Sequence, residues 1–236
     1  MIQILIAMIL FAAGGAGTLL LPHRNMYAVR IGVGTAMAGC VCGLAGALPA
    51  LFQGRDGVQE TVWTLSFSFD ALSALFLLPV FVIGAFAALH AVGYLREERN
   101  RGRFWTFFNF TLAAMTWVAL AVTPVEFLCA WELMGVMSFA LVAFEWRKKE
   151  TLRAAWIYLL SCQAGAALLI LMFVYGASDN APPAFLSAVI VLGMAGFGLK
   201  AGFPVLHVWL PEAHPAAPAP VSALMSGAMI NLGFYG

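Results

Sequence analysis

The sequence has 236 residues, of which 63% are apolar and 10% are charged, and its mean hydropathy is +0.92. Soluble domains are about half apolar and a quarter charged, so the composition excludes a soluble globular protein and indicates a polytopic membrane protein in a lipid bilayer. The net charge of +1 gives no electrostatic basis for binding nucleic acid.

Apolar stretches recur along the chain and predict membrane helices, because only a helix or a closed barrel satisfies every backbone group in hydrocarbon. We predict an all-α fold with seven transmembrane helices, the start of an eighth, and a discontinuous seventh helix. No positively charged region precedes the first stretch, so we expect a retained membrane helix there and not a secretory signal. The expected segments are about 2–21, 28–52, 70–95, 104–122, 124–144, 152–176, 183–210 and 219–236.

The connection before the third helix ends in TVWTLSFSF, whose alternating β-branched and aromatic residues predict a short outer hairpin. Asp70 then precedes the helix and is a candidate for its N-cap, with ion uptake as the alternative. The fourth connection, at Thr123-Pro124, is so short that the helices on either side must be adjacent and antiparallel. Residues 176–183 form an ordinary turn, which we expect on the outer side of the membrane.

Basic residues concentrate in the odd-numbered connections, which hold 10 of the 12, whereas the even-numbered ones hold only Arg55 and the last, Lys200, lies within a helix. The positive-inside rule therefore places the odd connections in the cytoplasm and the N-terminus outside, in a bacterial-type inner or plasma membrane. The ten are Arg24, Arg30, Arg96, Arg99, Arg101, Arg103, Arg147, Lys148, Lys149 and Arg153.

The four cysteines lie inside apolar runs without metal-ligand spacing, so we expect small packing residues and no metal or cofactor site. Glycines of the second helix predict close helix packing in place of a dinucleotide loop, since no strand precedes them. A small-residue face is also expected on the seventh helix, from Gly193, Gly196, Gly198, Ala201 and Gly202.

Three ionisable residues fall clearly within membrane runs, and they are the candidate proton path: Glu132, Lys200 and His207. A charge in hydrocarbon costs about 2.5–3.5 kcal/mol, so such residues usually face a bundle interior and pair or carry protons. We expect Lys200 to pair with Glu132, since desolvation favours the neutral amine and a carboxylate favours the ammonium. Each residue also has a structural alternative. Glu132 could be a neutral, desolvated glutamate or could link two helices, Lys200 could extend its amine to the membrane interface, and His207 could be a packed neutral imidazole.

Gly202 and Pro204 predict a helix break directly after Lys200, because proline has no N–H to donate. Broken helices of this kind mark ion sites in many transporters. Further candidates for the path are Glu126, at the outer end of the fifth helix, and Glu212 and His214, where loop capping is the alternative. Gln163 and Ser138 are expected to be interior polar groups that hold water or bond across helices.

The stretches FDALSALF (69–76), WELM (131–134) and LKAGFPVLHVWLPEAHPAAPAPVSALMSG (199–227) carry a family resemblance. They resemble the antiporter-like membrane subunits of respiratory complex I, Mrp-type Na⁺/H⁺ antiporters and membrane-bound nickel–iron hydrogenases. The wording of 210–227 is most similar to the branch of hydrogenase-4 component B and formate hydrogenlyase. The resemblance implies two inverted five-helix repeats, with Glu132, Lys200 and His207 at the positions of the family's glutamate, lysine and histidine.

On that resemblance, residues 1–103 are the N-terminal helices and 104–236 an incomplete first repeat, so we expect an N-terminal fragment that cannot translocate ions alone. Asn231 stands where many relatives carry a lysine, and an amide cannot hold a proton charge. It is therefore a further position on the path, and one that puts efficient pumping in doubt.

The resemblance implies a non-redox, proton-translocating subunit of a hydrogenase or NADH-quinone-oxidoreductase type complex. Such a subunit has no catalytic centre or cofactor of its own, and other membrane subunits and a peripheral redox arm would be its partners. Two alternatives stay open. One is a component of a multisubunit Na⁺/H⁺ exchanger, and the other is a membrane scaffold without transport, since fold alone does not establish function.

Overall fold

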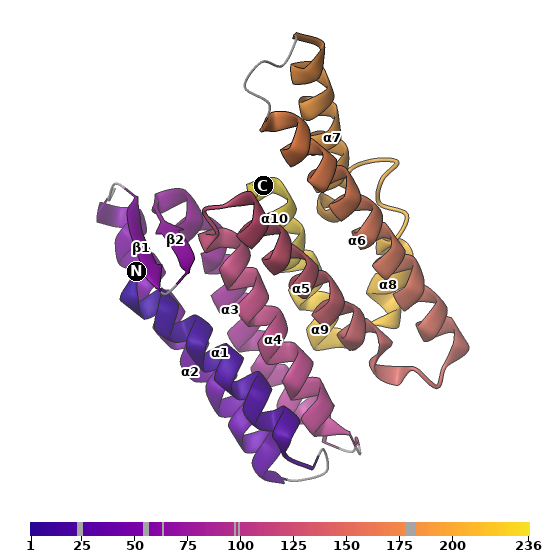
Figure 1. Ribbon diagram of the computed structural model, residues 1–236. Coiled ribbons are helices and arrows are strands. Elements are labelled where there is room, and N and C mark those ends of the chain that lie inside the picture. Colours follow the sequence, from indigo (N-terminus) through magenta and orange to yellow (C-terminus); the bar gives the residue numbers. More distant parts are fainter. Residues whose placement is uncertain (23–25, 54–56, 63, 97, 99, 178–182) are drawn as a thin grey trace.

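The computed structural model describes residues 1–22, 26–53, 57–62, 64–96, 98, 100–177 and 183–236, and Figure 1 shows its course. The described residues are helical apart from one β-hairpin and short connections. The N-terminal helices are α1 (Ile2–Leu20), α2 (Met26–Gln53), α3 (Ala71–Tyr94), α4 (Arg101–Leu120) and α5 (Pro124–Val142), which ends in a 3-10 turn (Ala143–Glu145).

The C-terminal half contains two long helices and a series of short ones: α6 (Lys149–Gly176), α7 (Pro183–Ala201), α8 (Leu210–Ala216), α9 (Ala219–Leu224), a π-helical turn (Met225–Met229) and α10 (Ile230–Tyr235). α6 and α7 pack side by side and stand apart from the group formed by α1 to α4 (Figure 1). Helices therefore occupy the predicted segments, but α4 and the short helices from Ala219 onward are not among those long and apolar enough to cross a membrane, and the predicted seventh segment divides after Ala201.

Five helices in the described part of the chain are long and apolar enough to cross a bilayer. The chain is an all-α polytopic membrane protein. The apolar part of α7, Phe185–Ala201, is shorter than these five. The five are Ile2–Leu20, Met26–Phe52, Ala71–Tyr94, Pro124–Glu145 and Lys149–Gly176.

Glycines allow the N-terminal helices to approach one another closely. A methyl group on Gly32 would lie 2.4 Å from Trp105 of α4, and one on Gly39 would lie 2.4 Å from Phe11 of α1. Their packing role is confirmed, whereas Gly34 has open space around its β-position. The first four helices thus form one closely packed group.

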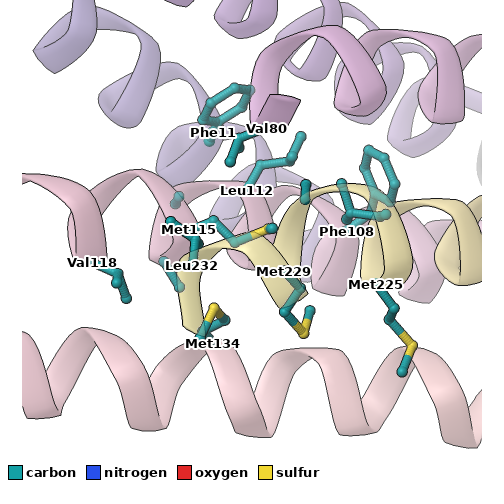
Figure 2. Close-up of a cluster of buried hydrophobic side chains, with 14 of the residues drawn as sticks. Phe11, Val80, Phe108, Leu112, Met115, Val118, Met134, Met225, Met229 and Leu232 are labelled. Atoms are coloured by element: carbon teal, nitrogen blue, oxygen red, sulfur yellow. The ribbon is translucent and has the colours of Figure 1, made fainter. Parts of the chain in front are cut away.

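The C-terminal helix, residues 219–235, packs mainly against α3 and α7 and also contacts α4 and α5. Figure 2 shows Met225, Met229 and Leu232 of this helix lying between Met115 of α4 and Met134 of α5, and all five side chains are buried. Methionine fits irregular gaps because its side chain is unbranched and flexible. The helix that follows the proline-rich stretch is therefore part of the core.

A two-stranded hairpin lies beside the N-terminus, as the sequence predicts (Figure 1). β1 (Val58–Val62) pairs antiparallel with β2 (Leu65–Phe69). The N-cap predicted for α3 is also confirmed, since Asp70 accepts a bond of 2.7 Å from the backbone N–H of Ser73. At the same end of the molecule, Glu126 forms a capping box with Thr123 and accepts the N–H of Ser66 at 2.8 Å. Its carboxylate ties β2 to α5.

The connection between α5 and α6 is rich in charge. Lys148 forms an ion pair with Glu145, and the hydrogen bond and charge of that carboxylate raise the pKa of the Lys148 ammonium. Arg24, Arg55 and Arg99 of the orientation argument, and most of the turn predicted at 176–183, lie outside the described residues.

Candidate functional site

The break after Lys200 is built from backbone chemistry. Gly202 has φ +71°, and the N–H of Phe203 bonds to the carbonyl of Gly198 at 2.9 Å. This six-residue closure with glycine in a left-handed conformation is the Schellman helix end. Pro204 has no N–H to offer the carbonyl of Lys200, four residues earlier, so the helix cannot continue. The predicted break at Gly202 and Pro204 is therefore confirmed.

Trp209 follows the break in the chain, and its side chain packs back against the end of α7. Its indole N–H donates to the carbonyl of Leu199 at 2.6 Å, and the side chain is 1% exposed. Between the two ends, Val205 has φ 75°, a left-handed conformation that a β-branched residue rarely adopts. The turn is thus clamped to the last turn of α7, next to Lys200.

Replacing Trp209 with phenylalanine should destabilise the break. The ring keeps its apolar contacts, but the buried carbonyl of Leu199 loses the indole donor, at a cost of about 1–3 kcal/mol. Denaturant titration of the purified protein in detergent measures this loss. Trp156→Phe is the matched control, because Trp156 is half exposed on α6 and should leave the midpoint unchanged. Equal midpoints for the two variants would contradict the clamp.

Lys200 is buried, with 4% of its surface exposed, so the amine does not snorkel to an interface here. Its Nζ donates to the hydroxyl of Tyr158 at 2.7 Å and lies 3.4 Å from the Sγ of Cys162. It also lies 4.9 Å from the centre of the Tyr158 ring, within cation–π range. The lysine is therefore held by neutral groups of α6.

Tyr158 passes the hydrogen-bond chain onward. Its hydroxyl lies 2.7 Å from Ser138 Oγ of α5 and 3.1 Å from Met229 Sδ, while Ser138 itself bonds to the carbonyl of Met134 at 2.6 Å. The Tyr158 ring packs against that of Trp209, with centroids 5.1 Å apart. Ser138 bonds across helices, as predicted.

Glu132 differs from the expectation that it pairs with Lys200. Its Oε2 accepts a bond of 2.7 Å from Nε2 of Gln163 on α6, and no ion pair joins it to Lys200 in the described part of the chain. Gln163 bonds across helices as predicted, but it is exposed and not interior. In place of the expected pairing, α6 supplies a neutral hydrogen-bond partner to each of the two groups.

The remaining sequence candidates lie away from Lys200. His207 is exposed in the turn, with Nδ1 3.3 Å from the carbonyl of Phe203. His214 contacts the hydroxyl of Ser222, which joins α8 to α9, and Asn231 donates to the carbonyl of Gly227 within its own helix. The structure therefore brings only Lys200 into the buried network, with Ser138, Tyr158, Cys162 and Met229 around it.

Glu212 lines a polar cavity of about 570 Å³ between the start of α6 and α8. Glu145, Lys148 and Glu150 also line it, and so does Ala154, which is buried one helical turn before Tyr158. The cavity thus extends along α6 toward the buried network.

The predicted small-residue face of α7 serves three different contacts. Gly196 meets Gly165 of α6, where an added methyl on either would lie 3.0 Å from the other's carbonyl oxygen. Ala201 meets Gly233 of α10, where an added methyl group on the glycine would lie 2.6 Å from the Ala201 nitrogen, and Gly202 provides the left-handed turn. Backbone contacts of this kind hold α6, α7 and α10 together around Lys200.

Sequence reasoning missed Tyr158 and Trp209. Both are aromatic residues in apolar runs, where packing is the ordinary role, and neither spacing nor charge distinguishes them. Trp209 could have been found by asking which nearby donor serves a helix end broken by glycine and proline. The cysteines are free, and no group of three metal-ligating side chains occurs among the residues described.

A buried ionisable residue beside a broken membrane helix is a feature that recurs at the ion sites of transporters. Two family models match the chain: "NADH:quinone oxidoreductase/Mrp antiporter, TM" over residues 121–236, and "NADH-Ubiquinone oxidoreductase (complex I), chain 5 N-terminus" over 58–105. The chain belongs to the family of antiporter-like membrane subunits. The family resemblance seen in the sequence is confirmed.

Relatives show how the family varies. The chain is 30% identical to hydrogenase-4 component B of Escherichia coli, over 98% of this chain and 37% of that protein. It is 31% identical to subunit N of the F420H2 dehydrogenase of Methanosarcina mazei, over 75% and 39%, and 30% identical to a Na⁺/H⁺ antiporter subunit A1 of Staphylococcus haemolyticus, over 70% and 22%. The chain spans less than two-fifths of the length of each.

Solved structures share the fold. A chain of the membrane-bound sulfane sulfur reductase, an archaeal respiratory complex, matches with a TM-score of 0.78 and 25% identity, over 99% of this chain and 40% of that one. A chain of respiratory complex I from Thermus thermophilus matches with a TM-score of 0.78 and 20% identity, over 99% and 52%.

Proposed function

We propose that this chain is part of a proton-translocating membrane subunit of a respiratory hydrogenase or NADH-quinone-oxidoreductase type complex. The observation that carries the proposal is the burial of Lys200 at the helix break, within a hydrogen-bonded network. A protonatable amine held inside a membrane protein costs free energy, and proton movement is the common reason to keep one. Electron transfer would take place in partner subunits and a peripheral redox arm.

The proposed path starts at the polar cavity beside Glu212, runs along α6 to Lys200 and continues toward Glu132. The cavity reaches Ala154, one turn from Tyr158, which supports this direction. His207, His214, Glu126 and Asn231 stay proposed members of the path, although their present contacts lie outside the network around Lys200. Gln163 enters through its bond to Glu132.

The membrane arrangement we propose is seven transmembrane helices with the start of an eighth, the seventh being α7 with its break. Residues 1–103 would form the N-terminal helices and 104–236 the first antiporter-like repeat. The hairpin end would lie outside and the end with Arg96, Arg147 and Lys148 in the cytoplasm, because basic residues favour that side.

The test is redox-driven proton movement in sealed vesicles that contain the assembled complex. Addition of the electron donor should acidify the compartment on the outer side of the membrane, independently of sodium, and an uncoupler should abolish the signal. A strict sodium requirement would favour the Na⁺/H⁺ exchanger, which the Staphylococcus relative also suggests. Electron transfer without any ion movement would favour the scaffold and overturn the proposal.

A further inference from the structure

Helix α6 provides a separate hydrogen-bond partner for each member of the expected ion pair, Lys200 and Glu132. Tyr158 accepts the bond from Lys200, and Gln163, five residues later, donates to Glu132; the two bonds are each 2.7 Å long. Both partners are neutral side chains. The positive and the negative group of the site thus have uncharged partners on one helix.

The contacts of Tyr158 suit a protonated lysine. The phenol oxygen accepts from Nζ, and its own hydrogen is free to bond to Ser138 or Met229, so every donor points away from the amine. The branch through Ser138 ends at the carbonyl of Met134, which cannot take up a proton. Tyr158 therefore positions the lysine, and this branch is not a route for its proton.

Cys162 connects the surroundings of Lys200 with those of Glu132. Cys162 lies 3.4 Å from the amine and also faces α5, since its Cβ would be 3.7 Å from a methyl group on Gly135. Gly135 is one helical turn from Glu132, and Gln163 adjoins Cys162 in the chain. A rotation of the long lysine side chain past Cys162 would bring the amine toward the carboxylate.

We propose that Tyr158 and Gln163 are positioning residues that keep Lys200 and Glu132 apart by competing for them. Two opposite charges attract strongly at low dielectric, so separated groups at membrane depth need other partners, and α6 provides one for each. This inference rests on the proposed function, in which the pair takes part. It assigns to α6 the control of whether the pair is open or closed.

Cross-linking with a membrane-permeant carbodiimide tests the separation directly, in membranes that hold the assembled complex. A carboxylate oxygen of Glu132 adds to the carbodiimide carbon while a carbodiimide nitrogen takes up a proton, giving an O-acylisourea. The Lys200 ammonium releases one proton, and the neutral amine then attacks the acyl carbon to form an amide, its second proton passing to the departing urea. Without a nearby amine the adduct rearranges to an N-acylurea on Glu132. Peptide mass spectrometry gives the ratio of the two products.

The wild-type protein should give mainly the N-acylurea, because its groups are held apart. Tyr158→Phe should raise the ratio of cross-link to N-acylurea about fivefold, the factor for one hydrogen bond. Gln163→Leu should raise it in the same direction, and it keeps the test valid if the buried tyrosine is needed for folding. Lys200→Met must abolish the cross-link, which verifies its identity.

Tyr235→Phe is the matched control, because the Tyr235 hydroxyl bonds to Ser73 and to the carbonyl of Ala119, outside this network. Its ratio should equal that of the wild type. Unchanged ratios in both Tyr158→Phe and Gln163→Leu, or a wild-type ratio already as high as theirs, would overturn the inference. The assay requires no ion movement, so it can succeed while the translocation test fails, and the reverse.

Discussion

Replacing Lys200 with methionine should lower redox-driven proton translocation by about a hundredfold, the scale on which a positioned proton-transfer group contributes to a rate. Methionine has a similar length and is apolar, so the buried position next to Tyr158 stays filled. The hydroxyl of Tyr158 keeps its contacts with Ser138 and Met229. The fold should therefore survive while the titratable amine is lost.

The measurement compares proton movement per electron in vesicles with electron transfer to an artificial acceptor. Electron transfer should persist, since the proposed function assigns it to partner subunits. Lys149→Met is the matched control, because Lys149 is exposed at the first residue of α6 and has the same charge. Normal proton movement by the Lys200→Met complex would end the proposal of a proton path through this lysine.

Replacing Gly233 with alanine should give the largest loss of stability among single methyl additions in the C-terminal half. The new methyl group would lie 2.6 Å from the backbone nitrogen of Ala201 and 2.9 Å from its Cα. Backbone cannot move aside as a flexible side chain can, so α10 must shift away from α7. Overpacking of this kind costs about 1–3 kcal/mol or more.

Thermal denaturation of the purified protein and its steady-state level in membranes measure this effect, and both should fall. Gly34→Ala is the matched control, because nothing lies within 4 Å of the added methyl group on α2. That variant should be as stable as the wild type. A Gly233→Ala protein with an unchanged midpoint would show that α10 does not press on the end of α7.

Features that depend on local sequence could be predicted. The break at Gly202 and Pro204 follows from one glycine that tolerates a left-handed turn and one proline without a donor. The cap at Asp70 and the hairpin before it follow equally from short-range patterns. The helix segments themselves follow from hydropathy, because the bilayer imposes their length.

The partners of Lys200 could not be predicted, because they depend on how α5, α6 and α7 pack. Two ionisable residues in neighbouring apolar runs suggest an ion pair, but Tyr158 and Gln163 intervene from a third helix. The depth and rotation of α6 decide this, and those are set by the close contact between Gly165 and Gly196. The sequence does not indicate that Gly165 and Gly196 contact each other.

The left-handed backbone of Val205 introduces conformational strain into the turn after Lys200. Such a conformation costs about 1–2 kcal/mol in a residue with a Cβ, and the contacts at either end of the turn must supply that energy. The bond from Trp209 to Leu199 is one of them. If opening that bond lets Val205 leave the left-handed conformation, the strain released offsets part of the cost of breaking the bond beside the lysine.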